Sequence, residues 1–120
     1  MAVRAVRGAI QVDADEPTAI YRGVQEMIAA VLDRNQITPA DVISIFFTAT
    51  TDLTSCFPAA GARQLGFNDV PLLCASEIAV PGSLPRVVRM LAHVETDAAR
   101  ADIRHAFLGA AAALRDDLKQ

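Results

Sequence analysis

Two spacings of apolar residues alternate along the chain, and each spacing predicts a type of secondary structure. An apolar-rich run over residues 2–12 predicts a strand, in which Gly8 marks a bulge or a close approach of another element. Acidic residues and Pro17 come next, followed by apolar residues three and four positions apart. This pattern predicts an amphipathic helix over 17–34, with Asn35 as its left-handed cap.

Shorter elements follow in the middle of the chain. Residues 38–41 have the pattern of a capped single turn. The β-branched and aromatic run 42–50 predicts a strand buried on both faces. Proline begins a short helix predicted over 58–65, which Gly66 ends, and 70–75 predicts another short buried strand.

The last third of the chain is ambiguous. In segment 84–95 apolar residues fit a helix at one spacing and a strand at another. Segment 103–114 contains four consecutive alanines, which favour a helix. Because strands and helices alternate, the fold class is α/β or α+β with a mixed sheet.

Composition narrows the class of protein. We expect one domain spanning residues 1–120, with 116–120 as a mobile tail. The sequence is 52% hydrophobic, yet no apolar run approaches the ~18 residues of a membrane helix. The apolar surplus therefore predicts a subunit interface, and so a homo-oligomer. Arginines interrupt the N-terminal apolar run, so no signal peptide or anchor is expected. Two cysteines are too few for a disulfide framework, which makes the cytoplasm the expected compartment.

Charge and aromatic content argue against nucleic acid as a partner. The net charge is −3 and the pI is about 5.2, whereas a nucleic-acid surface is basic. Five Phe, one Tyr and no Trp provide few platforms for base stacking.

Several polar residues are embedded in apolar stretches and are candidates for chemistry: Arg7, Arg63, Cys74, Glu77, Arg89, Arg104 and Arg115. These residues match no phosphate-binding loop motif and no metal-ligand spacing, so we expect neither a metal nor a cofactor. A nucleophile pair of Cys74 and His105 is conceivable, although it has no assigned third group.

The remaining set suits the binding of a compact dianion. Ten of the 11 basic residues are arginine, whose planar fork of donors matches carboxylates. Spacing alone leaves two interpretations of Glu77 open: an internal ion pair with an arginine, or a group that awaits a polar ligand.

Four stretches carry a resemblance to a known family: RAVRGAI (4–10), TATTDLTSCFPAAGARQLG (48–66), VPLLCASEIAVPGSLPRVVRML (70–91) and IRHAFLGAAAALRDDL (103–118). In this order, and over essentially the whole chain, they resemble the bacterial monofunctional chorismate mutases of the trimeric barrel type.

The resemblance implies both a fold and a reaction. Each chain would contribute a mixed sheet flanked by helices, and three chains would form a pseudo-α/β-barrel homotrimer with active sites between subunits. Arg89 would lie in a strand that follows a short helical turn, and 103–114 would be a strand despite its alanines. The reaction would be the rearrangement of chorismate to prephenate, a step toward phenylalanine and tyrosine, with no cofactor.

The resemblance also implies roles for individual residues. Arg7 would grip a substrate carboxylate, Arg89 would bond the ether oxygen, and Glu77 with Cys74 would hold the ring hydroxyl. The other residues implied to contact substrate are Phe57, Ala59, Ala60, Arg63, Leu73, Phe107 and Arg115. Phe57 would pack on the ring, and Arg63 and Arg115 would lie at the cleft mouth.

Three positions depart from the family pattern. Phe107 stands where the family typically has Tyr, Ala60 where some members carry Lys, and Leu73 where some carry a small polar residue. Each change removes a polar contact. Two other functions remain as alternatives: a domain that binds a carboxylate metabolite without catalysis, and a small trimeric enamine or imine hydrolase.

Overall fold

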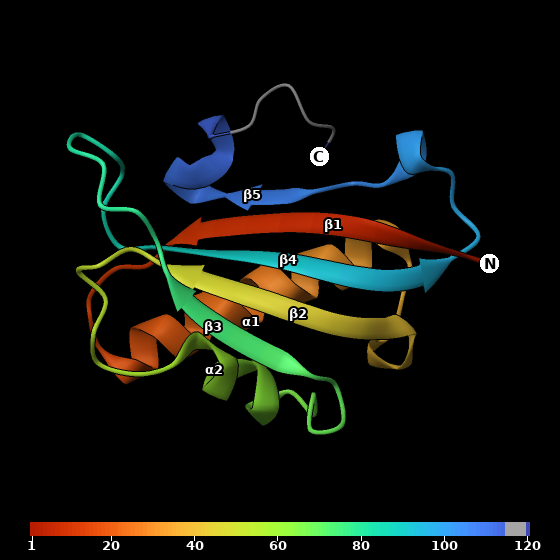
Figure 1. Ribbon diagram of the computed structural model, residues 1–120, viewed down its shortest axis with the longest axis horizontal. Coiled ribbons are helices and arrows are strands. Elements are labelled where there is room, and N and C mark those ends of the chain that lie inside the picture. The colour runs from red at the N-terminus through yellow and green to blue at the C-terminus, as the bar shows by residue number, and fades with distance from the viewer. Residues whose placement is uncertain (115–119) are drawn as a thin grey trace.

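A computed structural model describes residues 1–114 and 120, and its centre is a five-stranded mixed sheet in the order β3-β2-β4-β1-β5 (Figure 1). The strands are β1 (Ala2–Gln11), β2 (Val42–Ala49), β3 (Leu72–Ser76), β4 (Val87–Thr96) and β5 (Ala106–Leu108). The central strand β4 runs antiparallel to both of its neighbours, β1 and β2. The outer pairs, β1 with β5 and β2 with β3, are parallel.

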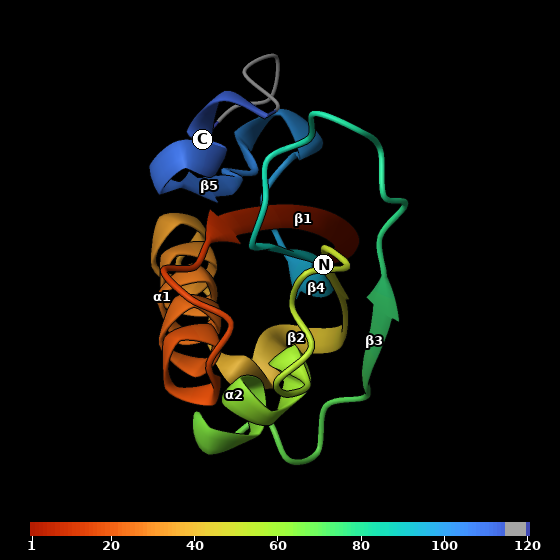
Figure 2. The same ribbon diagram turned by 90° about the vertical axis from the view of Figure 1, so that its left-hand side faces the viewer.

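Two α-helices, α1 (Pro17–Asn35) and α2 (Pro58–Gln64), lie on one face of the sheet (Figures 1 and 2). Alternate residues of β4 point toward them, so that Val88, Met90, Ala92 and Val94 are all buried. Buried apolar residues of α1 complete this core: Ile20, Val24, Met27, Ile28 and Val31. The mixed α+β class is confirmed, and α1 matches the predicted helix to within one residue.

Within residues 1–114 and 120, no α-helix lies on the opposite face of the sheet. A small buried cluster of Ala9, Val87, Phe107 and Ala111 covers one part of it, near the short 3₁₀ helix η3 (Gly109–Ala113). Elsewhere Phe46 of β2 is 45% exposed and Leu73 of β3 is 56% exposed. The prediction that 42–50 and 70–75 are buried is therefore wrong for the single chain, because the helices cover only one face.

The cap of α1 also differs from the prediction. The left-handed residue is Gln36, with φ 53°, rather than Asn35. The Asn35 amide instead donates to the Arg104 carbonyl and accepts from the Arg104 N–H, both at 2.8 Å. This tertiary contact ties the end of α1 to the segment before β5, and it requires Asn35 to stay in the last helical turn.

The C-terminal segment is a strand only in part. Strand β5 spans Ala106–Leu108, and the alanine-rich residues that follow form η3. Gly109 has φ +59°, which turns the chain out of the extended path. The expectation of a strand over 103–114 therefore holds only for Ala106–Leu108. Residues 103–105 precede the strand, and beyond Leu108 the helical propensity of alanine prevails.

Before β4, residues 77–86 form no helix. A hydrogen bond from Ser83 N–H to the Val80 carbonyl closes a turn at Pro81-Gly82, where a short helical turn was expected. At the other end of the fold, residues 38–41 form the expected capped turn, η1 (Pro39–Asp41) with Thr38 as cap. In the part of the chain that is described, no helix is long and apolar enough to cross a membrane.

Glycines allow α1 to approach the sheet closely. Gly8 in β1 pairs in regular register with Met90, so it marks a close approach and not a bulge. A Cβ at Gly8 would lie 2.9 Å from side-chain carbons of both Met27 and Met90. A Cβ at Gly23 of α1 would lie only 2.6 Å from Cγ1 of Val12. The layer spacing therefore depends on the absence of side chains at both positions.

We expect Gly23→Ala to lower the free energy of unfolding, although alanine is the better helix former by about 1 kcal/mol. Overpacking against the stiff β-branched Val12 costs typically about 1–3 kcal/mol, which outweighs that gain. Urea unfolding of the purified variant measures the difference. Ala29→Gly on the exposed side of α1 reports the propensity effect alone. A more stable Gly23→Ala protein would contradict the close approach.

Candidate active site

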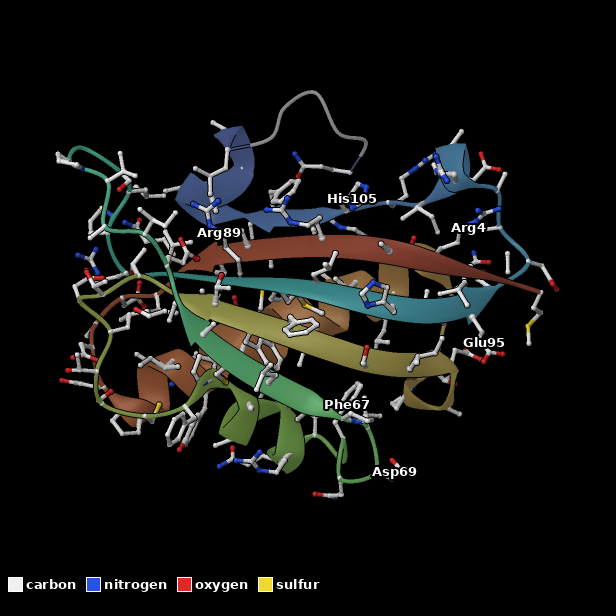
Figure 3. All side chains as sticks on the ribbon, viewed as in Figure 1. Arg4, Phe67, Asp69, Arg89, Glu95 and His105 are labelled. Carbon is white, nitrogen blue, oxygen red and sulfur yellow. The ribbon has the colours of Figure 1, made fainter. Side chains whose placement is uncertain are left out.

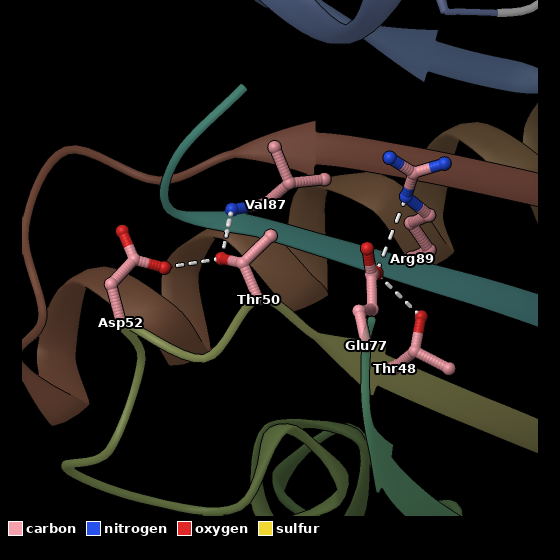
Figure 4. Close-up of polar contacts among 6 residues, drawn as sticks. All are labelled: Thr48, Thr50, Asp52, Glu77, Val87 and Arg89. Atoms are coloured by element: carbon pink, nitrogen blue, oxygen red, sulfur yellow. Dashed lines mark hydrogen bonds and ion pairs between the residues drawn. The ribbon is translucent and has the colours of Figure 1, made fainter. Parts of the chain in front are cut away.

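An ion pair between Glu77, which directly follows β3, and Arg89 of β4 lies at the centre of the candidate site (Figure 4). Arg89 Nε, on the central strand, is 3.2 Å from Glu77 Oε2, and their side chains are 28% and 16% exposed. Among the described residues, Arg89 Nε has no hydrogen-bond partner of good geometry. The contact is therefore mainly Coulombic, and it offsets the cost of taking two charges partly out of water.

By the strand register, Arg7 and Phe107 lie on the same face of the sheet as Arg89, which Figure 3 labels. The register places Ala9 of β1 opposite both Arg89 of β4 and Phe107 of β5. Arg7 is two residues before Ala9, so its side chain points to that face as well. The Arg7 guanidinium carbon is 5.8 Å from the centroid of the Phe107 ring, a cation–π distance.

His105 supports the Arg7 backbone. Its Nδ1 accepts a hydrogen bond from the Arg7 N–H at 2.9 Å, and its ring stacks on Phe107 with centroids 6.2 Å apart. The nucleophile pair of Cys74 with His105 is not assembled within one chain. Cys74 lies in β3 and His105 precedes β5, at opposite edges of the sheet.

A second group of predicted site residues lies at the β3 edge, apart from Arg7 and Phe107. A pocket of about 240 Å³ is lined by Phe57, Ala59, Arg63, Leu72, Leu73 and Cys74. Phe57 is 71% exposed. Ala60 lies in the first turn of α2, where its N–H donates to the Phe57 carbonyl at 3.0 Å. Arg115 and residues 116–119 of the expected tail lie outside the described residues.

A larger pocket of about 370 Å³ shares Phe57 and Cys74 with this edge and is also lined by Cys56. Burial raises the pKa of the Cys56 thiol above its ordinary value. The thiol form is therefore favoured at neutral pH, which suits a small, partly buried apolar group better than a nucleophile.

Loop contacts fix the start of β4 (Figure 4). The Thr50 hydroxyl accepts from the Val87 N–H at 3.0 Å and donates to the Asp52 carboxylate. The second oxygen of Asp52 accepts from the Arg86 N–H at 3.0 Å. Arg86 has φ 53°, an uncommon conformation for a residue with a side chain. These bonds hold the chain in the bend from which β4, and with it Arg89, begins.

Sequence reasoning missed three polar residues near the ion pair: Thr48, Thr50 and Asp52. The Thr48 hydroxyl donates to Glu77 Oε2 at 2.7 Å. Alternation within 42–50 puts Thr48 on the same face as Phe46, but no sequence signal pairs its hydroxyl with Glu77.

Comparison with known proteins decides the family. The sequence model of chorismate mutase type I matches residues 3–118. The chain belongs to this family. It is accordingly a chorismate mutase, an isomerase, and the resemblance inferred from the four sequence stretches is confirmed.

Named relatives agree with this assignment. The chain is 48% identical over 118 residues to chorismate mutase AroH of Thermus thermophilus, covering 98% of this chain and 97% of the relative. It is 34% identical to chorismate mutase AroH of Bacillus subtilis, covering 98% and 94% of the two chains. A solved chorismate mutase from Clostridium thermocellum superposes with a TM-score of 0.87 at 39% identity, over 89% of this chain and 96% of that one.

We expect Asp52→Asn to destabilise the protein at pH 7 and to have less effect in acid. The hydrogen bond from Thr50, aided by the Arg86 N–H, lowers the pKa of Asp52 below its ordinary value. A pKa lowered by folding contributes stability above the unfolded value, and this stability is lost as the pH falls through the folded value. Melting temperatures of variant and parent should therefore converge below about pH 4.

Asp69→Asn provides the matched control, because Asp69 is also exposed and lies in a loop away from β4. Its melting temperature should follow that of the parent at every pH. A constant difference between Asp52→Asn and the parent from pH 7 to pH 3 would contradict the role of the charged carboxylate.

Proposed function

We propose that this chorismate mutase rearranges chorismate to prephenate, in the route to phenylalanine and tyrosine, by conformer selection and electrostatic stabilisation. The observation that carries this mechanism is the Arg89–Glu77 pair on the uncovered sheet face, with Arg7 two residues from the β1 partner of Arg89. Chorismate carries two carboxylates, a hydroxyl and an ether oxygen. Its ether C–O bond breaks as a C–C bond forms within the same molecule, so the step needs no proton transfer or cofactor.

Each residue then has a distinct task. Arg7 binds a substrate carboxylate through its planar fork. Arg89 donates to the ether oxygen, which gains negative charge as the C–O bond lengthens. Glu77 and Cys74 hold the ring hydroxyl. The remaining contacts come from Phe57, Ala59, Ala60, Arg63, Leu73, Phe107 and Arg115, with the two arginines at the cleft mouth.

Two effects supply the acceleration. Binding selects the compact chair-like conformer in which the reacting carbons are close, an orientation effect. The guanidinium of Arg89 supplies charge that is already in place at the transition state. A millionfold acceleration requires about 8 kcal/mol, and one well-placed charged donor typically supplies about 3–4 kcal/mol. Arg89 is thus a large single contributor, and conformer selection provides much of the rest.

We further propose that three chains form a homotrimer, a pseudo-α/β-barrel with the sheets facing inward. Support comes from the sheet face on which the described residues form no α-helix, where Phe46 and Leu73 are 45% and 56% exposed and lie side by side in register. Association would remove this apolar surface from water. It would also bring the β3-edge group of one chain, with Phe57 and Arg63, against the Arg7–Arg89 group of a neighbour.

Arg89→Ala should lower kcat/KM for chorismate by at least about a hundredfold, because it removes the positive charge that stabilises the developing negative charge on the ether oxygen. Loss of the chorismate diene absorbance, with prephenate identified as product, measures the rate. Arg89→Lys should recover only part, since an ammonium lacks the planar fork. Arg22→Ala, on an exposed part of α1, serves as a control for loss of positive charge. Near-normal turnover by a folded Arg89→Ala protein would refute the role.

Shared sites predict that two damaged chains can complement each other. Phe57→Asp damages the β3-edge group, because it places a negative charge where the dianion would bind. Arg89→Ala damages the Arg7–Arg89 group, because it removes the central cation. Each variant alone should be nearly inactive. In trimers co-assembled from equal amounts, about a quarter of the sites receive both intact groups, so activity should recover to about that fraction.

The control mixes the two variants after each has assembled separately, under conditions where subunits do not exchange. Light scattering of each preparation gives the number of chains. If co-assembly restores no activity, each site is built within one chain, and the shared-site arrangement is wrong.

A further inference from the structure

Glu77 occupies a position where the backbone alone does not fix its side chain. It directly follows β3 and begins the segment 77–86, which is neither helix nor strand. Its N–H donates to the Ala49 carbonyl at 2.9 Å, which anchors the main chain to the end of β2. A glutamate side chain has three further rotatable bonds, so the orientation of its carboxylate must come from a side-chain contact.

Thr48 provides that contact from the neighbouring strand. Its Oγ1 donates to Glu77 Oε2 at 2.7 Å, and the same carboxylate oxygen lies 3.2 Å from Arg89 Nε (Figure 4). Thr48 pairs directly with Arg89 in the β2–β4 register, so both side chains stand on one face of the sheet. Threonine is branched at Cβ and restricted at χ1, so its hydroxyl approaches Glu77 from a fixed direction.

The two contacts on Oε2 differ in kind. The Thr48 bond is directed, whereas Arg89 Nε, within the described part of the chain, has no hydrogen-bond partner of good geometry. A guanidinium held only by Coulombic attraction can turn its donors toward a ligand without breaking a directed bond. The carboxylate would then keep its orientation through Thr48. Its other oxygen, Oε1, accepts no hydrogen bond from the described residues.

We propose that Thr48 is a positioning residue of the active site. Its hydroxyl fixes the Glu77 carboxylate, so that Oε1 is aimed at the ring hydroxyl of the substrate while Arg89 turns to the ether oxygen. This inference rests on the proposed function and extends it to a residue that does not itself touch the reacting atoms. Because the side chain is held before substrate arrives, the site avoids reorganisation during the reaction.

The test uses Thr48→Val, which keeps the shape of the side chain and removes the hydroxyl. We expect kcat/KM for chorismate to fall about tenfold, the lower range for losing a hydrogen bond to a charged group. Thr48→Ser restores the donor and should return kcat/KM to within about threefold of the parent. Thr51→Val, at an exposed turn position in the loop after β2, removes a hydroxyl elsewhere and should leave the rate unchanged.

A double-mutant cycle separates positioning from a purely structural role. If Thr48 acts through Glu77, Thr48→Val should change kcat/KM by less than about twofold in a Glu77→Ala background. A structural role would lower the rate by the same factor in both backgrounds. Thr48→Ala takes the place of Thr48→Val in the cycle if the valine protein does not fold.

The outcomes also distinguish this inference from the proposed function. If the parent protein converts chorismate and Glu77→Ala is impaired, but Thr48→Val is as active as the parent, only the role of Thr48 is overturned. Equal losses in both backgrounds overturn it too. If the parent protein fails to convert chorismate, the proposed function falls and the role of Thr48 falls with it.

Discussion

The pairing of Arg89 with Glu77 is the interaction on which the rest of the site depends. A guanidinium on the central strand of a sheet needs an acidic partner nearby, because unpaired charge is costly away from water. The strand order supplies this acidic partner, because β2 lies between β3 and β4. The Ala49 carbonyl of β2 accepts from the Glu77 N–H, and the Thr48 hydroxyl of β2 donates to the Glu77 carboxylate. Because the ion pair is not a directed hydrogen bond, it stabilises both charges without locking the fork of Arg89.

The same arrangement requires a sheet with one covered face and one uncovered face. The α1 and α2 layer buries alternate residues of β4, and the residues between them, including Arg89, point the other way. Gly8 and Gly23 let the covered side pack closely. The uncovered side carries charged residues beside exposed apolar ones such as Phe46. In the proposed trimer, one surface would thus serve both assembly and substrate binding.

The local sequence pattern predicted secondary structure correctly where contacts within one element determine its conformation. Apolar residues at helical spacing located α1, and proline and glycine bounded α2. Prediction was wrong where distant contacts decide. Asn35 is kept helical by its bonds to Arg104, and the run 42–50 has an exposed face because no α-helix among the described residues covers it. Arg89 and Glu77 could be selected as charges in apolar surroundings. Thr48 could not, because its role arises only from the register of β2 with β4.

The aromatic ring at position 107 illustrates how burial changes an interpretation made from sequence. Compared with the tyrosine typical of the family, Phe107 lacks a hydroxyl, which suggested a lost bond to substrate. Yet the ring is only 2% exposed, and it packs with Ala9 and Val87 while the Arg7 guanidinium carbon lies 5.8 Å from its centroid. A ring so placed has little surface left for a ligand, so the substrate contact proposed for it is small. The apolar body of the ring can still orient the Arg7 cation, a task that needs no hydroxyl.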